Sequence, residues 1–251
     1  MCYRPIRFHA KGQIVMKIYD SIIDQTIGAA KAAGANVTRY NPSLCWPETD
    51  RSELVMQRDA AFELGGSGKA SVNYTCVTTE DSFDQDEIWI SGTELKEIKG
   101  DVSFGRVVIL KTDEFENDET AFAAIRDMEF TRYHVFPKGY MVRVSSTSFE
   151  ERVRVSKEAV KEGISLSKVG ASYIKRYKAV PGVKNVRIIF FVDQNLDALV
   201  PNAKKVEEIT KAVTHIVDGL PTDCGHCSMK KVCDEVEGMK EMHLRDRGRK
   251  M

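Results

Sequence analysis

The sequence lacks an imbalance of charge. Its 251 residues include 37 basic and 37 acidic side chains, so the formal net charge at pH 7 is zero. A protein without excess positive charge exerts no long-range attraction on nucleic acid or on an anionic membrane. We therefore expect neither nucleic acid nor a membrane among its partners.

Long apolar segments are missing as well. No run approaches the roughly 18 apolar residues that a membrane-spanning helix needs. The first residues, MCYRPIRFHAKG, lack the apolar centre of a signal peptide. A cytoplasmic location is therefore expected. With 42% hydrophobic and 29% charged residues, the composition is that of a globular protein of one large domain or two small ones.

Familiar catalytic motifs are also absent. There is no G-x-S-x-G or H-E-x-x-H sequence, and the five histidines are scattered, so hydrolase functions rank low. The segment ELGGSGKAS resembles a phosphate-binding loop, but Glu63 stands where that motif needs its first glycine and Ala70 where it needs a hydroxyl. A turn between strands is the preferred interpretation, with an anion contact from Lys69 as the alternative.

Hydrophobic periodicity divides the chain into helices and strands. Helical spacing predicts helices over 14–34, 118–136, 156–163, 166–177 and 203–217, with Ser156 as the cap of the third. Short β-like runs over 61–112 predict an irregular β region, and GYMVRVS and RVRVS are further strand candidates. The apolar run KNVRIIFFVD is typical of a buried interior strand. Strands and helices mix without strict alternation, which predicts an α+β (mixed α/β) fold with a compact mixed sheet and packed helices.

Three regions are expected along the chain. Residues 1–60 form an N-terminal helical extension, 61–220 an α/β domain, and 221–251 a cysteine-rich tail that binds metal. The helix over 14–34 has an apolar face that needs a cover, so we expect it to pack on the central domain.

The cysteines supply the strongest chemical signal. Three of the six, Cys224, Cys227 and Cys233, crowd into ten residues after a helix that ends near Gly219. Thiols at this spacing can converge on a zinc ion or an iron–sulfur cluster. The alternative is that they are free thiols in a tail.

The missing fourth ligand has several candidates. Zinc could take His226 or His243. A four-iron cluster, which we prefer, would recruit a distant cysteine, and the candidates are Cys76, Cys45 and Cys2.

Three segments together resemble a known family. They are FELGG, DEIWISGTEL and the long stretch from RVRVSKEAV to IIFFVD, and they span roughly Ala61 to Asp193, over half of the chain. In this order they look like the central domain of acetyl-CoA synthase, the beta subunit of the carbon monoxide dehydrogenase/acetyl-CoA synthase complex. The resemblance implies a role in anaerobic one-carbon metabolism, with carbon monoxide dehydrogenase or corrinoid protein subunits as partners.

The same resemblance implies which chemistry is missing. The family's catalytic centre is a nickel site joined to a four-iron cluster, and it needs a Cys-Gly-Cys element and a further cysteine, whereas no cysteine follows Cys233 here. We therefore expect an iron–sulfur protein without a complete nickel site, active in acetyl transfer only together with other chains. The alternatives are a non-enzymatic module that docks a corrinoid or methyl-carrier protein, and a zinc-stabilised domain unrelated to acetyl transfer.

Basic residues gather in the part of the sequence where the family binds coenzyme A. The family has a tryptophan where this sequence has Arg152, so the sequence departs from the family pattern at this position. Charge-assisted bonds to the phosphates of coenzyme A could come from Arg143, Arg152, Arg154 and Lys157. Further lysines and arginines follow at Lys161, Lys168, Lys175 and Arg176. The alternative is a solvated basic surface balanced by glutamates.

Overall fold

The computed structural model describes residues 17–49, 55, 57–66, 68–132, 135–147 and 149–218. Its helices are α1 (Asp20–Ala32), α3 (Asp118–Thr131), α4 (Lys157–Lys161), α5 (Leu166–Lys178) and α6 (Val200–Val217). Its strands are β1 (Asn36–Arg39), β2 (Ala61–Leu64), β3 (Ser71–Thr78), β4 (Glu87–Gly92), β5 (Phe104–Thr112), β6 (Met141–Thr147), β7 (Glu150–Ser156) and β8 (Val183–Val192).

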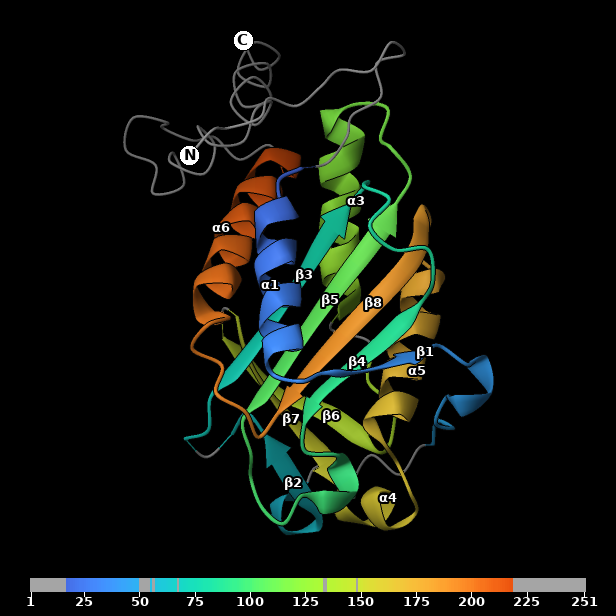
Figure 1. Cartoon of the computed structure of the whole chain (residues 1–251), viewed down its shortest axis with the longest axis vertical. Helices are drawn as coiled ribbons and strands as arrows, with labels where there is room; N and C mark the ends of the chain where they lie inside the picture. Colours follow the sequence, from blue (N-terminus) through green and yellow to red (C-terminus); the bar gives the residue numbers. More distant parts are fainter. Residues whose placement is uncertain are drawn as a thin grey trace.

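A five-stranded mixed sheet forms the centre of the molecule (Figure 1). Its strand order is β1-β4-β8-β5-β3, with β8 in the middle, parallel to β4 and antiparallel to β5. The side chains from Val186 to Val192 are at most 1% exposed, apart from Arg187. The prediction that KNVRIIFFVD is an interior strand is therefore confirmed.

A small antiparallel sheet, in the order β2-β7-β6, lies at one end of the large sheet (Figure 1). The two sheets meet where β3 begins: the Glu151 amide donates to Ser71 Oγ (3.0 Å) and the Asn73 amide donates to the Phe149 carbonyl (2.8 Å). The region that we expected to be irregular therefore supplies regular strands to two sheets. The loop ELGGSGKAS carries the chain from β2 in the small sheet to β3 in the large one.

Helices cover both faces of the large sheet. Helix α1 crosses in front of it in Figure 1, while α3 and α5 lie behind it. Ser91 Oγ of β4 donates to the carbonyl of Ala33 at the end of α1 (3.1 Å). On the other face, Gly170 of α5 sits over Ile88, and a Cβ there would come within 2.8 Å of the isoleucine side chain. The missing side chain lets the helix approach the sheet closely.

The N-terminal region belongs to the same core. The buried residues Ile22 and Ile23 of α1 join the hydrophobic cluster of the large sheet, as expected for a helix with an apolar face. The same region also supplies β1, which pairs with β4 and was not predicted. Ser156 caps α4 by accepting a hydrogen bond from the Ala159 amide (3.3 Å), as the sequence indicates.

The structure confirms the α+β fold class, with mixed sheets and packed helices. Within its described residues, no helix is both long enough and apolar enough to cross a bilayer.

Candidate functional site

Two of the four basic residues predicted to bind phosphate meet at one buried carboxylate. Arg154 of β7 stands opposite Glu63 of β2, and its Nε and Nη2 atoms lie 2.9 and 2.7 Å from Glu63 Oε1. Arg152 lies on the same face, with its Nε 3.8 Å from Glu63 Oε2. The Glu63 side chain is 3% exposed and that of Arg152 is 41% exposed. Arg154 therefore neutralises a buried charge, whereas Arg152 keeps a face toward solvent.

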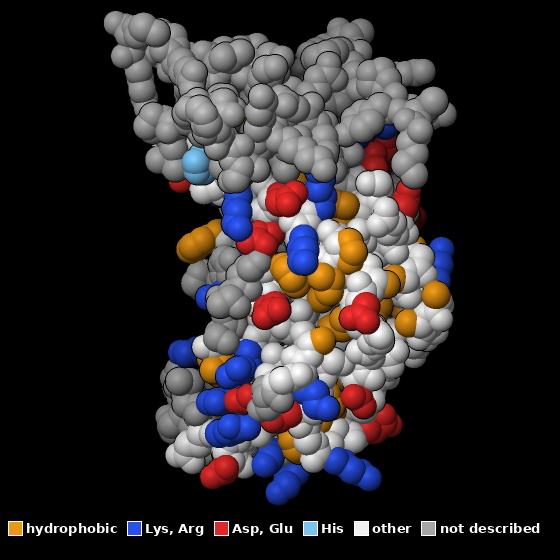
Figure 2. Space-filling model, turned by 90° about the vertical axis from the view of Figure 1, so that its left-hand side faces the viewer, with side chains coloured by type: hydrophobic (Ala, Val, Ile, Leu, Met, Phe, Trp, Pro, Cys, Tyr) orange, Lys and Arg blue, Asp and Glu red, His pale blue; other side chains and the backbone are white. Residues whose placement is uncertain are grey.

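The other two predicted residues point elsewhere. Lys157 Nζ donates to the carbonyl oxygen of Asp59 (2.8 Å). Arg143 of β6 stands opposite Val153 of β7, and paired residues share a face of the sheet. Because neighbours along a strand alternate between faces, Val153 and Arg154 lie on opposite faces. Arg143 therefore projects from the face opposite to Arg154. The structure thus brings Arg152 and Arg154 together and separates Arg143 from them. Lysines and arginines are frequent at the lower end of the molecule, interspersed with acidic side chains (Figure 2).

The glycine-rich loop packs against the same carboxylate. Gly66 lies over the Glu63–Arg152 contact, and a Cβ at this position would come within 2.5 Å of Glu63 Oε2 and 3.0 Å of Arg152 Nε. The Lys69 amide donates to the Gly66 carbonyl (3.0 Å), which closes a turn, and the Lys69 side chain is exposed. Gly66 therefore allows close packing on a charged pair.

The predicted metal ligands Cys224, Cys227 and Cys233 lie outside the described residues. Cys76 is a core residue of β3 with no exposed surface. Burial, with a further contribution from Glu129, raises the pKa of its thiol well above the usual value. A metal binds the thiolate, so this environment opposes a ligand role for Cys76. Within the described ranges, no group of three His, Cys, Asp or Glu side chains could hold a metal ion.

A buried polar network between the two sheets was not predicted. Arg106 of β5 has no exposed surface, and its Nη2 lies 2.9 Å from Oε2 of Glu151 of β7, which is 1% exposed. Arg106 Nε and Nη2 also donate to Asn73 Oδ1, at 3.2 and 2.7 Å. Burial alone would lower the pKa of Arg106, but Glu151 raises it above its usual value. An arginine of one sheet is thereby fixed to a glutamate of the other.

A second ion pair adjoins this network at the end of α3. Arg132 Nη1 lies 2.8 Å from Oε1 of Glu129 and donates to the Asn73 carbonyl (3.4 Å). The side chains of Arg132 and Glu129 are 7% and 11% exposed. Burial raises the pKa of the Glu129 carboxyl, although Arg132 and Arg106 each act to lower it.

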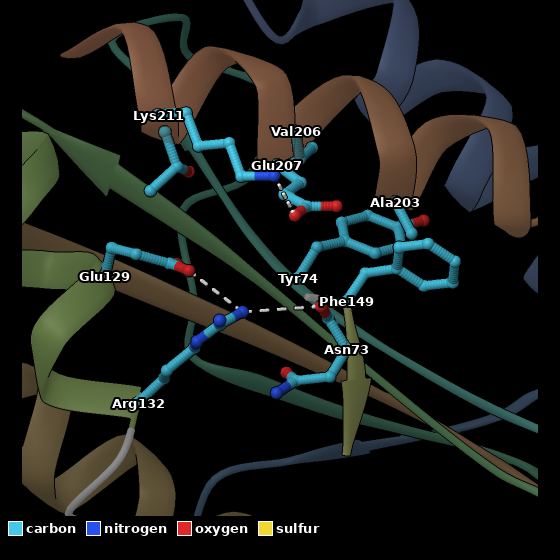
Figure 3. Close-up of a pocket in the computed structure, with 10 residues that line it drawn as sticks. Asn73, Tyr74, Glu129, Arg132, Phe149, Ala203, Val206, Glu207 and Lys211 are labelled. Carbon is cyan, nitrogen blue, oxygen red and sulfur yellow. Dashed lines mark hydrogen bonds and ion pairs between the residues drawn. The ribbon is translucent and has the colours of Figure 1, made fainter. Parts of the chain in front are cut away.

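This pair lines a cavity of about 270 Å³ between α3, α6 and the outer edge of β3 (Figure 3). From α6 come Ala203, Val206, Glu207, Thr210 and Lys211. Asn73 and Tyr74 of β3, together with Phe149, complete the wall. The cavity thus combines an apolar surface with two ion pairs, Glu129–Arg132 and, on α6, Glu207–Lys211.

A sequence signal for the network exists in part. Arg106 is a charged residue inside the apolar run GRVVILKT, and a charge within a buried strand indicates a buried partner. Glu129 and Arg132 have the three-residue spacing of a helical ion pair. The strand partner Glu151 has no such local signal.

The sequence profile of one family matches residues 49–196, which is more than half of the chain. The matched segment contains β2 to β8, and therefore Glu63, Arg106, Arg152 and Arg154, whereas α6 and the three clustered cysteines follow it. A search of curated proteins gave no match. Because the match covers most of both sheets, the chain belongs to the family of the CO dehydrogenase/acetyl-CoA synthase complex beta subunit.

Proposed function

We propose that this chain is an acetyl-CoA synthase-related iron–sulfur protein of CO and acetyl-CoA metabolism that acts together with other chains of the complex. The family match over 49–196, which includes four strands of the large sheet and all of the small one, is the observation that carries the proposal. The partners would be a carbon monoxide dehydrogenase subunit or a corrinoid protein.

The iron–sulfur centre is assigned to the tail. Cys224, Cys227 and Cys233 follow α6, which ends at Val217, and their short spacing lets three thiolates reach one cluster. Cys76 could join them only if the core opened, because its side chain has no exposed surface. The proposal therefore places the fourth ligand outside the core. A complete nickel site is not part of it, since the sequence has no Cys-Gly-Cys element.

Metal analysis of the full chain tests this assignment. After anaerobic purification and reconstitution, we expect about four irons and four labile sulfides per chain, without stoichiometric nickel. Serine at Cys224, Cys227 or Cys233 should lower the iron content, while Cys76→Ala, at a buried core position that this assignment excludes as a ligand, serves as the matched control. Zinc without sulfide would instead identify a zinc-stabilised domain, and unchanged iron in all three tail variants would contradict the site.

Coenzyme A contact is assigned to the exposed face of Arg152. Its Nε is buried, but its side chain is 41% exposed, so a phosphate could bind the guanidinium group from the solvent side. Arg154 would act through Glu63, by holding the carboxylate that Arg152 also faces. Arg143 and Lys157 would stand at the margins of such a site.

Ligand binding separates this assignment from a solvated basic surface. Arg152→Gln should raise the Kd for coenzyme A about tenfold, as expected for one charge-assisted phosphate contact. Lys204→Gln, at an exposed position of α6, is the control. Equal affinities of the wild type and Arg152→Gln would contradict a phosphate contact at Arg152.

A further inference from the structure

The cavity beside β3 contains two ion pairs on opposite walls. Figure 3 shows Glu129 and Arg132 on the side of α3, and Glu207 and Lys211 on α6 across the cavity. Lys211 Nζ lies 2.5 Å from Glu207 Oε1, and the Arg132 pair is joined at 2.8 Å. Each wall therefore presents one cation and one carboxylate to the same space.

A third part of the wall is apolar. The rings of Tyr74 and Phe149 lie at one end of the cavity, with Ala203 and Val206 of α6 beside them (Figure 3). The Tyr74 hydroxyl is already bonded to Thr26 Oγ1 (2.6 Å), so this ring offers mainly its carbon surface.

Charge balance restricts what can occupy this cavity. Its lining carries two positive and two negative side chains, which balance one another. A ligand with one net charge would add a charge that no side chain of the lining compensates. A zwitterion preserves the balance and can still form charge-assisted bonds at both ends. The volume of about 270 Å³ lies just below the usual range of small-molecule sites, about 300–1,000 Å³.

We propose that this cavity binds a free α-amino acid with an apolar side chain. Its carboxylate would contact Arg132 and Lys211, its ammonium group Glu129 and Glu207, and its side chain the rings of Tyr74 and Phe149. Helix α6 lies beyond the segment that matches the family, so half of the site comes from a part of the chain outside that match. The site is independent of the proposed cluster.

Calorimetric titration of the full chain tests the ligand class. L-phenylalanine, L-leucine and L-methionine are the probes. 3-Phenylpropionate lacks the ammonium group of phenylalanine, and 2-phenylethylamine lacks its carboxylate. We expect at least one amino acid to bind, and each truncated analogue of phenylalanine to bind about tenfold more weakly or worse than phenylalanine itself, because each loses one charge-assisted contact.

Matched substitutions on α6 locate the site. Glu207→Gln and Lys211→Met remove charges that line the cavity, while Glu208→Gln and Lys204→Met remove charges from exposed positions of the same helix that do not line it. Only the first two should raise the Kd, by about tenfold each. Thr210→Trp should abolish binding by filling the cavity. Circular dichroism and thermal unfolding verify that each variant is folded.

The outcomes are distinct. The proposal is supported if an amino acid binds the wild type and Thr210→Trp abolishes that binding. If Thr210→Trp does not fold, weaker binding by Lys211→Met supports it instead. The absence of binding for all three amino acids up to about 10 mM, a ligand concentration well above ordinary metabolite affinities, overturns it. Equal or tighter binding of 3-phenylpropionate overturns the zwitterion requirement, and equal effects of the two pairs of α6 variants overturn the location.

Discussion

Two arginine–carboxylate pairs, one fully buried and one partly exposed, occupy different places in this fold. Arg154 and Glu63 belong to neighbouring strands of the small sheet, which the backbone already joins. Arg106 and Glu151 belong to different sheets, and neither side chain is more than 1% exposed. Both distances are short, at 2.7 and 2.9 Å. The difference shows that similar ion pairs can serve different purposes, since one reinforces a sheet and the other orients two sheets.

The largest effect is expected at the pair between the sheets. Arg106→Met removes the cation and leaves Glu151 as a buried charge without its partner. Breaking such a pair costs about 3–5 kcal/mol of unfolding free energy. Urea unfolding followed by circular dichroism measures the loss. The double variant with Glu151→Gln should recover part of it, and a loss below about 1 kcal/mol for the single variant would show that the pair does not hold the sheets together.

A smaller effect is expected within the small sheet. Arg154→Met removes two hydrogen bonds to Glu63 Oε1, but Arg152 remains 3.8 Å from the same carboxylate, and the Arg152 side chain is exposed to water. The loss of unfolding free energy should be about 1–3 kcal/mol. Denaturation under the same conditions as Arg106→Met gives the comparison directly. If Arg154→Met were the more damaging of the two, the ranking by burial would be wrong.

Glu129 should make the stability of the folded protein depend on pH. Burial raises the folded-state pKa of this carboxyl above its ordinary value of 4.5. As pH rises through 4.5, Glu129 loses its proton in the unfolded chain before it does so in the folded state. The folded state then binds more protons than the unfolded chain, so its stability falls until the pH passes the folded-state pKa. Glu129→Gln removes this pH-dependent contribution to the free energy of unfolding.

Its stability relative to the wild type should therefore rise as pH increases from 4.5 toward neutrality. Urea unfolding at a series of pH values measures the difference. Glu208→Gln, at an exposed position of α6, is the control. If the stability of Glu129→Gln relative to the wild type fell over this pH range, the pH dependence would have the opposite sign and the prediction would be wrong.

Local patterns identified most elements of the fold. The apolar run of β8 and the Ser156 cap of α4 are properties of neighbouring residues, and both were predicted. Strand β1 (Asn36–Arg39) was not, because its residues are mostly exposed and it joins the sheet by pairing with β4. An edge strand of this kind has little hydrophobic pattern of its own.

The candidate sites depend more on register and on distant contacts. Arg152 and Arg154 share a face because their spacing is two, which the sequence shows. The position of Arg143 depends on how β6 pairs with β7, where the register shifts between Arg143 and Ser145. Arg106 meets Glu151 only because two sheets come together at β3. No local pattern encodes that contact.

The smallest effect on stability is expected for Arg152→Gln. Its side chain is 41% exposed and its closest approach to Glu63 is 3.8 Å, whereas Arg154 provides the short contacts to that carboxylate. Weak, partly solvated pairs contribute about 0–1 kcal/mol, so unfolding should change little. A residue that contributes little to folding can be selected for binding, and the proposed tenfold loss of coenzyme A affinity would then occur without a loss of structure. If Arg152→Gln destabilised the protein as much as Arg154→Met, Arg152 would mainly neutralise Glu63. The two arginines would then have the same structural role.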